Sequence, residues 1–311
     1  MRTIFYLGIW LLLTGHATAA SQPIIDMHRH APLSGSTDSE SIDAMIDVLK
    51  QHNVVVSVVA ITSPEQALAW QDKSDRFVLG AMMPCPRNLG SPWYYCFPET
   101  QGVPNLQWLR GRVQSGAVSA FHEMMFNYDG SLPGDAKLVP FWALAVEFNL
   151  PVGVHSWSGP PPGKSIRKDP NCCPNYNGDI GNPKHLRVVL DRHPGLNIWL
   201  QHVGSDGDSM PELWTETLSL LEDYPNVYVD LSITNSILPI EDYEKALVRL
   251  LESGFGNRIM LGSDNVPLDI ILKRLNSIKS ISEKQRAAIL YDNAANFLNL
   301  SEAERDGHYG R

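Results

Sequence analysis

The chain has 311 residues, of which 43% are hydrophobic and 19% are charged, and its formal net charge at pH 7 is −9. An acidic protein of this kind is not expected to bind nucleic acid or anionic membrane surfaces, because both attract basic proteins. The length fits one (β/α)8 barrel of roughly 250 residues with insertions.

The first 20 residues have the pattern of an export signal. Arg2 precedes an apolar run over residues 4–13, and the small residues Ala17-Thr18-Ala19 form a cleavage site. An uncleaved anchor is the alternative, but this run is about half as long as a membrane-spanning helix requires. No later stretch is long and apolar enough for stable membrane insertion. We therefore predict a signal peptide over residues 1–20, a periplasmic or secreted protein, and a single domain over residues 21–311.

The rest of the chain alternates short apolar runs with amphipathic segments, which is typical of a parallel α/β fold. Strands are predicted at residues 23–28, 54–61, 76–83, 117–124, 151–155, 196–202, 226–231 and 258–263. Helices are predicted at residues 41–51, 64–70, 105–115, 140–148, 184–192, 210–223 and 240–252, with a final helical region at 281–300. Eight strands with intervening helices favour a closed (β/α)8 TIM barrel over an open doubly wound sheet.

Two long loops are predicted after the third and the fifth strand. Residues 84–104 and 156–183 are rich in Pro, Gly, Asn and aromatic residues. Loops that follow barrel strands lie on the catalytic face, so we expect these two to form its walls or a lid. Their aromatic residues could line a pocket or simply pack the loops, namely Trp93, Tyr94, Tyr95 and Trp157. Their basic residues could bind a substrate carboxylate or be solvated loop charges, namely Arg87, Lys164, Arg167 and Lys168.

The same two loops contain all four cysteines, Cys85, Cys96, Cys172 and Cys173. An exported protein can form disulfides, and four cysteines allow three pairings. Adjacent cysteines bridge each other only with strain, so we expect Cys172 and Cys173 to pair outward, with Cys85 and Cys96 as partners. A thiolate zinc site is the alternative, but no two cysteines have the C-x2-C spacing of a structural zinc.

Four of the predicted strands end on residues that can bind a metal. The first leads to Asp26-Met27-His28-Arg29-His30, the fifth to His155, the sixth to His202 and the eighth to Asp264. A barrel collects its catalytic residues at the carboxyl ends of its strands, so these side chains should converge. Imidazoles and a carboxylate placed in this way indicate a divalent metal, with zinc as the best match.

The spacing along the first strand predicts which side chains face the metal. Side chains alternate along a strand, so His28 and His30 should both point into the barrel, and Asp26 should orient a ligand one layer deeper. A pair of surface histidines at a strand end is the alternative, but Ile24-Ile25 before the pair argues against it. Arg29 is the best single candidate for binding a substrate carboxylate, yet its parity points it away from the interior.

The fourth strand ends on His122 and Glu123, and alternation places only one of them inside. We favour an inward Glu123, which would bridge two metal ions, whereas an outward Glu123 would pair with a helix. Taken singly, His155 and His202 fit hydrogen-bonded structural histidines, and Asp264 fits a turn residue. Their joint placement at strand ends is what supports a metal site with one or two ions.

The chain resembles the amidohydrolase superfamily, specifically its amidohydrolase-related TIM-barrel branch, which includes lactone hydrolases and metal-dependent decarboxylases. The resemblance rests on residues 25–30, His155, His202, residues 261–267 and the closing stretch 289–298. It covers essentially the whole chain after the predicted signal peptide.

The resemblance implies specific roles for these residues. The ligands of a catalytic metal would be His28, His30, His155 and Asp264. His202 would bind a second metal or contact the substrate. Many two-metal members carry a carboxylated lysine on strand four, but this chain has none there, and Glu123 resembles the bridging glutamate of other members.

These observations predict metal-assisted hydrolysis of an amide, ester or lactone bond in a small molecule. A bound zinc lowers the pKa of a water molecule from about 15.7 toward about 7. Asp264 would accept the proton of this water and return it to the leaving group, while His202 or the metal would polarise the attacked carbonyl. The alternatives are a metal-dependent decarboxylase or hydratase and a non-catalytic exported binding protein. The sequence makes no prediction of the oligomeric state.

Overall fold

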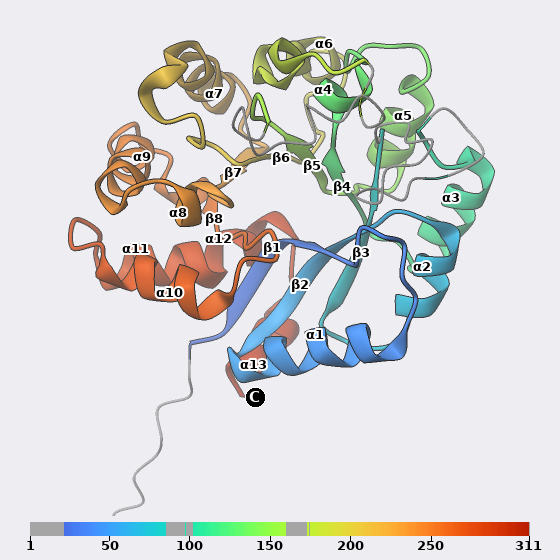
Figure 1. The fold of residues 1–311 in the computed structure, drawn as a ribbon, viewed down its shortest axis with the longest axis horizontal. Helices are drawn as coiled ribbons and strands as arrows, with labels where there is room; N and C mark the ends of the chain where they lie inside the picture. The colour runs from blue at the N-terminus through green and yellow to red at the C-terminus, as the bar shows by residue number, and fades with distance from the viewer. Residues whose placement is uncertain (1–21, 85–96, 98–101, 160–172, 174, 311) are drawn as a thin grey trace, which may run out of the picture.

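Eight parallel strands form a nearly closed barrel with helices around it, as Figure 1 shows for the computed structural model. The structure describes residues 22–84, 97, 102–159, 173 and 175–310. The strands follow one another around the barrel in chain order, from β1 to β8, and each hydrogen-bonded pair is parallel. This arrangement confirms the predicted (β/α)8 TIM barrel.

All eight predicted strands are present. They are β1 (Ile24–His30), β2 (Val54–Ile61), β3 (Phe77–Met82), β4 (Ala120–Met124), β5 (Val152–His155), β6 (Ile198–Gln201), β7 (Val227–Asp230) and β8 (Ile259–Met260). β1 runs on to His30, whereas the prediction ended at residue 28. The extension follows from a hydrogen bond of the next residue, in which the amide of Ala31 donates to the carbonyl of Ala60 on β2.

The helices alternate with the strands along the chain and lie outside the barrel (Figure 1). The α-helices are α1 (Ser39–Gln51), α2 (Pro64–Trp70), α3 (Leu106–Gln114), α4 (Phe126–Asp129), α5 (Val139–Glu147), α6 (Arg187–Leu190), α7 (Pro211–Asp223), α8 (Thr234–Ile237), α9 (Ile240–Glu252), α10 (Leu268–Ser277), α11 (Glu283–Ala287), α12 (Asn293–Phe297) and α13 (Glu302–Tyr309). Short helical turns are η2 (Gly178–Gly181), η3 (Pro183–Leu186), η4 (Gly207–Ser209), η5 (Gly256–Arg258) and the π-helical η6 (Ala288–Asp292).

The predicted helices are present, with two kinds of difference. The segment predicted as one helix at 184–192 is divided between η3 and α6, because Pro183 starts a tighter turn. No helix was predicted at the positions of α4, α8, α10 and α13. α10 buries Leu268, Ile271 and Leu275, which is a helical spacing along one face.

The core lies between the sheet and the helices. Every residue of β2 is buried, as expected for a parallel strand that is covered on both faces. The longer outer helices bury one stripe each. In α9 that stripe is Tyr243, Ala246, Leu247 and Leu250, and none of the charged residues of the helix is buried.

The seam between β1 and β8 is joined at its carboxyl end by backbone hydrogen bonds. The amide of Met27 donates to the carbonyl of Leu261, and the amide of Asp264 donates to the carbonyl of His28. Further down the barrel, Trp199 and Met260 pack in one apolar cluster with Phe297 of α12. The interior is therefore apolar at one end, and its polar side chains gather at the carboxyl ends of the strands.

Several predictions fall on residues outside the described ranges. The signal peptide, Cys85, Cys96, Cys172 and most of the two long loops are among them. Cys173 is described and packs against a small cluster that contains Met82 and Met125. The disulfide pairing and the role of the loops therefore stay predictions. Among the described residues, no helix has the length and hydrophobicity to cross a membrane.

Candidate metal centre

The six predicted ligands converge at the carboxyl ends of the strands. They are His28 and His30 on β1, Glu123 on β4, His155 at the end of β5, His202 after β6 and Asp264 after β8. Five of these side chains are buried, with at most 7% of their surface exposed, whereas the Asp264 side chain is 21% exposed. The cluster therefore opens toward solvent beside Asp264.

Glu123 lies between two pairs of histidines. Its Oε1 is 3.0 Å from Nδ1 of His155 and 3.1 Å from Nε2 of His202. Its Oε2 is 3.1 Å from Nε2 of His30 and 3.9 Å from Nε2 of His28. Each carboxylate oxygen thus faces a different pair, one from β1 and one from β5 and β6.

Asp264 completes the first of these groups. Its Oδ1 is 3.1 Å from Nε2 of His30 and 3.7 Å from Nε2 of His28. The two Nε2 atoms are themselves only 3.2 Å apart. Two imidazoles and two carboxylates therefore surround one small volume, as the His-x-His spacing on the first strand predicted.

A β-bulge in β4 turns both His122 and Glu123 inward. Phe121 pairs with Val152 and Met124 pairs with Val154, so β4 has one residue more than β5 between these pairs. The prediction that only one of His122 and Glu123 could face the interior is therefore wrong, because regular alternation breaks down at a bulge.

His122 lies beside the six predicted ligands and belongs to none of the candidate metal-binding groups of the described residues. Its ring centre is 4.8 Å from that of His28 and 5.7 Å from that of Trp199. Among the described residues, neither of its ring nitrogens has a hydrogen-bond partner. Burial sets the pKa of His122 well below the usual value, and the charges of His28 and His30 lower it further. Gly80 of β3 makes room for it, because a Cβ there would lie 2.7 Å from the His122 Cβ.

Three of the six predicted ligands have a left-handed backbone. The φ angles of Glu123, His202 and Asp264 are 46°, 62° and 48°. For an L-residue this conformation costs about 1–2 kcal/mol, and it is uncommon outside glycine and asparagine. Such strain is characteristic of functional sites, where the surrounding structure holds the residue in place. The sequence shows none of it, since alternation rules assume a regular strand.

Asp26 and Arg29 hold the strand that carries the first two histidines. Oδ1 of Asp26 accepts hydrogen bonds from the amides of His28 and Ser263, at 3.2 and 2.9 Å. Nη1 of Arg29 donates to Oδ2 of Asp26 and to Oγ of Ser263, at 3.2 Å each. Asp26 thus contacts the predicted ligand His28 through its backbone and not through its imidazole ring. Nη1 of Arg29 is therefore directed to the segment around Asp26 and Ser263, and the role of Arg29 in binding a substrate carboxylate stays a prediction.

The side chain of Asn265 makes the hydrogen bonds with the backbone of His30 that a neighbouring strand would otherwise make. Its side-chain Oδ1 accepts from the His30 amide at 3.1 Å, and its Nδ2 donates to the His30 carbonyl at 3.0 Å. The amide group of one side chain therefore continues the pairing between β1 and the segment after β8. No separate role was predicted for Asn265.

The charges in the centre depend on one another. Burial alone would lower the pKa of His30, but the Glu123 charge and hydrogen bonds with Asp264 and Glu123 raise it to about 10. Burial would raise the pKa of Glu123, yet the charge of His30 and the hydrogen bonds of His155, His202 and His30 hold it well below its usual range. Histidines also outweigh burial at Asp264 and lower its pKa. The ionised carboxylates therefore require positive charge beside them.

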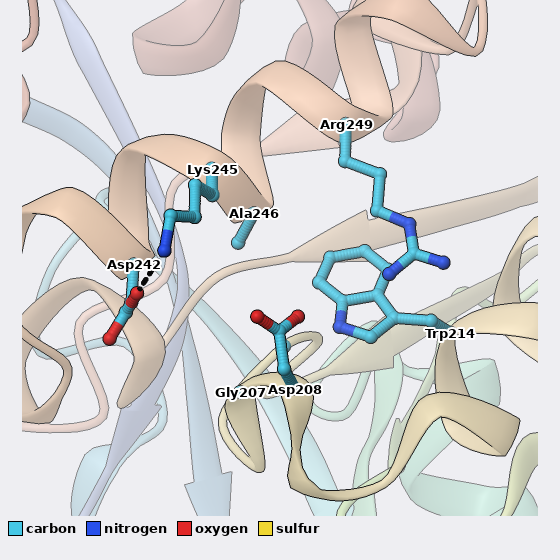
Figure 2. A pocket seen from close by; sticks show the side chains of 8 residues that line it. Gly207, Asp208, Trp214, Asp242, Lys245, Ala246 and Arg249 are labelled. Carbon is cyan, nitrogen blue, oxygen red and sulfur yellow. Dashed lines mark hydrogen bonds and ion pairs between the residues drawn. The ribbon is translucent and has the colours of Figure 1, made fainter.

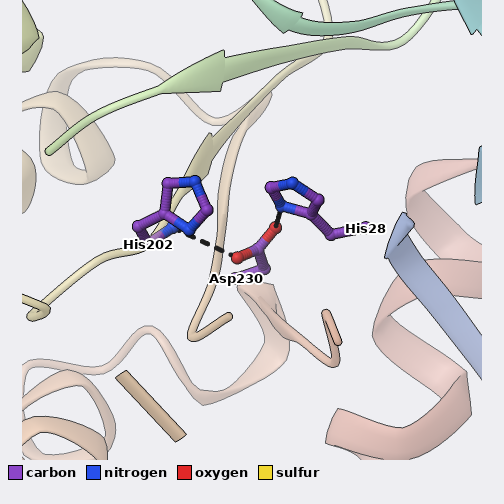
Figure 3. Close-up of side chains that lie close together, drawn as sticks. All are labelled: His28, His202 and Asp230. Atoms are coloured by element: carbon purple, nitrogen blue, oxygen red, sulfur yellow. Dashed lines mark hydrogen bonds and ion pairs between the residues drawn. The ribbon is translucent and has the colours of Figure 1, made fainter. Parts of the chain in front are cut away.

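Two further residues of the centre, Asp230 and Ser232, were not predicted. Both are fully buried at the end of β7, and Figure 3 shows Asp230 between His28 and His202. A signal was present in the sequence, because the predicted strand at 226–231 also ends on a carboxylate after an apolar run. Ser232 carries no comparable signal.

Aromatic rings border the histidines on the side of the loops. The ring of Tyr128, from α4, is 5.3 Å from that of His155, and the ring of Trp157 is 6.0 Å from that of His202. Trp157 was predicted as a residue of the pocket wall, and it lies beside the cluster. The other predicted wall and charge candidates lie outside the described residues, namely Arg87, Trp93, Tyr94, Tyr95, Lys164, Arg167 and Lys168.

A second polar site lies at the surface between the loop after β6 and α9 (Figure 2). It has a volume of about 150 Å³, and Asp208 points into it. Lys245 bonds Asp242 at 2.9 Å across one side, and the guanidinium of Arg249 lies 4.7 Å from the Trp214 ring on the other. Its cations and anions already pair with one another or face water.

The buried cluster, by contrast, fits a divalent cation. Its donor atoms are imidazole nitrogens and carboxylate oxygens, which zinc and manganese bind. Within the part of the chain that the structure describes, no lysine or arginine forms an ion pair with Glu123 or Asp264. Buried carboxylates are stable only when they are paired or coordinate a metal. The histidines must therefore either carry protons or share a cation with the carboxylates.

Comparison with known proteins agrees with this architecture. The family model described as amidohydrolase matches residues 107–300, more than half of the chain. The matched region contains Glu123, His155, His202 and Asp264, whereas β1 lies before it. No protein of curated function matches the chain significantly.

Solved structures share the fold at low sequence identity. A probable 2-pyrone-4,6-dicarboxylic acid hydrolase from Acinetobacter baumannii, with citric acid bound, is 16% identical with a TM-score of 0.61, over 89% of this chain and 99% of that one. An amidohydrolase from Burkholderia multivorans with bound zinc is 15% identical with a TM-score of 0.60, over 90% and 100%. A 5-carboxyvanillate decarboxylase from Novosphingobium aromaticivorans, complexed with manganese and 4-hydroxy-3-methoxy-5-nitrobenzoic acid, is 14% identical with a TM-score of 0.56, over 90% and 97%.

Proposed function

The chain belongs to the amidohydrolase family, and on that basis we propose that it is a metal-dependent hydrolase of an amide, ester or lactone bond in a small molecule. The observation that supports this most is the position of Glu123, whose two carboxylate oxygens each face a separate pair of histidines. A carboxylate in this position can bridge two cations, which is one way in which enzymes activate water for hydrolysis.

The donor atoms fall into two groups that share Glu123. His28, His30 and Asp264 would hold one ion with Oε2 of Glu123, and His155 and His202 would hold a second with Oε1. Zinc suits this mixture of nitrogen and oxygen donors. The Burkholderia multivorans structure contains zinc and the Novosphingobium aromaticivorans structure contains manganese, so both metals are candidates.

When bound, a divalent cation acts as a Lewis acid that lowers the pKa of water and polarises a carbonyl oxygen. Asp264 is the group best placed to move a proton, since it is the partly exposed member of the cluster. Burial opposes its ionisation, but His28 and His30 hold its pKa below the usual range, so the carboxylate is ionised at neutral pH. It accepts the proton of the attacking water and returns it to the leaving group.

His202 has a second role if the protein binds only one ion. Burial lowers the pKa of His202, but its hydrogen bond with Glu123 and the charges of Asp264 and Glu123 outweigh burial and raise the pKa. A protonated His202 donates a hydrogen bond through Nε2, which in a one-ion enzyme would be directed to the carbonyl oxygen under attack.

A decarboxylase is the second candidate. The solved structures with the same fold include decarboxylases of 5-carboxyvanillate and of 2,6-dihydroxybenzoate. The same ligands can support either reaction, because the fold does not fix the chemistry.

Metal analysis and a substrate panel would test both candidates. The protein would be purified with zinc or manganese, its metal content counted, and its activity assayed on lactones, esters, amides and hydroxylated aromatic carboxylates. Product formation by addition of water without release of carbon dioxide supports the hydrolase. Carbon dioxide release from the aromatic acids supports the decarboxylase, and a protein that binds no metal under metal-replete conditions contradicts both.

We also propose that the protein is exported, on the evidence of residues 1–20. Expression of the full chain followed by mass measurement of the product should give a protein that begins at Ala20 or Ser21. A product that retains Met1 and the apolar run 4–13 would contradict export by this route.

A further inference from the structure

Asp230 and Ser232 contact two of the histidines through the ring nitrogen that faces away from Glu123. Oγ of Ser232 is 3.2 Å from Nδ1 of His28 and 2.9 Å from Nδ1 of His202. Oδ2 of Asp230 is 3.4 Å from the same Nδ1 of His28. The Nε2 atoms of both rings point toward Glu123 instead.

The hydroxyl of Ser232 donates its hydrogen bond to Asp230. Its Oγ lies 2.5 Å from Oδ1 of Asp230, which also accepts from the amides of Ser232 and His202, at 3.0 and 3.2 Å. An oxygen that accepts three hydrogen bonds belongs to an ionised carboxylate, so the hydroxyl must donate to it. A serine hydroxyl has only one proton, and both of its remaining bonds are therefore acceptor bonds.

The two histidines must supply those remaining protons. All three side chains are fully or almost fully buried, and no other partner of these Nδ1 atoms lies closer than Ser232 in the described part of the chain. His28 and His202 then each carry a proton on Nδ1. In a neutral imidazole this leaves Nε2 with its lone pair, which is the form that binds a metal.

We propose that Ser232, held by Asp230, is a positioning residue that fixes His28 and His202 in the Nδ1–H tautomer and thereby presents both Nε2 atoms to a cation. One serine would thus prepare a ligand from each of the two histidine pairs that Glu123 separates. The inference rests on the metal site of the proposed function.

The backbone next to Ser232 supports a fixed position for its side chain. Ile233 has φ 64° and ψ −53°, and the amide of Thr234 donates to the carbonyl of Ser232 at 2.6 Å. This is a tight three-residue turn that a β-branched residue rarely adopts. It reverses the chain directly after Ser232 and before α8.

Nuclear magnetic resonance of ¹⁵N-histidine-labelled, metal-free protein at alkaline pH tests the tautomers directly. Signals would be assigned by their loss in His28→Gln and His202→Gln. We expect both rings to carry the proton on Nδ1 in the wild type and in Ser232→Thr, which keeps the hydroxyl. Ser232→Ala should shift both rings toward the Nε2–H form. Protonation of both rings on Nε2 in the wild type would overturn the proposal.

Zinc affinity, measured by competition with a chromophoric chelator, provides a second readout. Loss of a residue that orients metal ligands typically reduces metal affinity about 10–100-fold, and we expect this for Ser232→Ala. Ser205→Ala is the matched control, because Ser205 is also buried and its Oγ bonds Thr234 at 2.7 Å. The control should keep the wild-type affinity.

Two further results keep the test decisive. If Ser232→Ala does not fold, Ser232→Cys preserves the shape with a weak acceptor and should show the same direction of change. Equal affinity and equal tautomers in Ser232→Ala and Ser205→Ala would overturn the proposal. A wild type that binds no zinc would contradict the proposed function instead, while the spectra of the metal-free protein would still decide the tautomers.

Discussion

The candidate metal centre and the surface pocket between the loop after β6 and α9 contain the same acidic residue type but differ in what balances it. At the surface, Asp242 pairs with Lys245, and their side chains are 40% and 69% exposed. In the centre, the ion-pair partners of Glu123 and Asp264 among the described residues are all histidines, and Glu123 is almost completely buried. Water screens the first pair, whereas the buried Glu123 has little solvent around it to replace a missing partner.

The charges of the surface pocket pair with one another or face water, whereas the buried carboxylates of the centre need protonated histidines or a bound cation beside them. Each lysine and arginine of the surface pocket already has a partner, Asp242 for Lys245 and the Trp214 ring for Arg249. When its histidines are neutral, the centre has more hydrogen-bond acceptor atoms, on carboxylates and imidazoles, than N–H protons to donate to them. Changes to the centre should therefore have large effects and depend on metal, while the same changes at the surface pocket should do little.

The largest expected effect is that of Asp264→Asn. An amide cannot accept the proton of the attacking water, and loss of such a transfer typically costs about 10²–10⁴-fold in rate. Turnover would be measured on a substrate identified by the panel, together with metal content. Asp242→Asn makes the identical change in the surface pocket and should leave turnover within about twofold. Full metal content with wild-type turnover in Asp264→Asn would refute its assignment.

Metal removal should have the next largest effect. A ligand present at about 100 times its Kd stabilises the folded state by about 2.7 kcal/mol, so a chelator should lower Tm. Glu123→Gln should show a smaller shift, because one shared carboxylate is lost from both groups of donors. Asp208→Asn, in the surface pocket, should keep the full shift. An equal response of the wild type and Glu123→Gln would remove Glu123 from the ligands.

The pH dependence of metal binding should follow His30. In the metal-free protein its pKa is raised to about 10, so at pH 7 it carries a proton that the metal must displace. Release of one proton makes the apparent affinity rise about tenfold per pH unit until pH approaches that pKa. Calorimetry in buffers of different ionisation enthalpy would count the protons. An affinity that is flat between neutral and alkaline pH would show that His30 is not a ligand.

The sequence predicted the parts of the centre that depend on strand position. A buried strand ends where a polar residue meets solvent, and this placed His155, His202 and Asp264 at one end of the barrel. The same rule applied to β7 would have found Asp230. The sequence pattern alone does not show whether Asp230 is more important than other strand-end residues, because it does not show which of these side chains contact the same histidines.

What the sequence could not predict depends on broken regularity and on distant contacts. The bulge in β4 lets both His122 and Glu123 face the interior, whereas regular alternation allows only one of them to do so. Alternation rules cannot locate the extra residue of a bulge. Asn265 and Ser232 act by filling hydrogen bonds of residues far away in the chain. Such pairings exist only after the barrel closes.

The smallest expected effect is that of Lys245→Met. Exposed ion pairs contribute little, and salt screens them over about 8 Å at physiological ionic strength. Turnover and metal content should match the wild type, and any difference in Tm should disappear in high salt. Thermal unfolding at low and high salt, with metal analysis of the same samples, would check this.

A different result would be informative because one loop connects the two regions. His202 follows β6 directly, and Gly204 and Gly207, which line the surface pocket, lie only a few residues further along. Trp214 packs so near Gly204 that an added Cβ would lie 2.9 Å from its ring. If Lys245→Met lowered metal content, the disturbance would have passed through this loop to His202. The surface pocket would then have to be treated as part of the support of the metal centre.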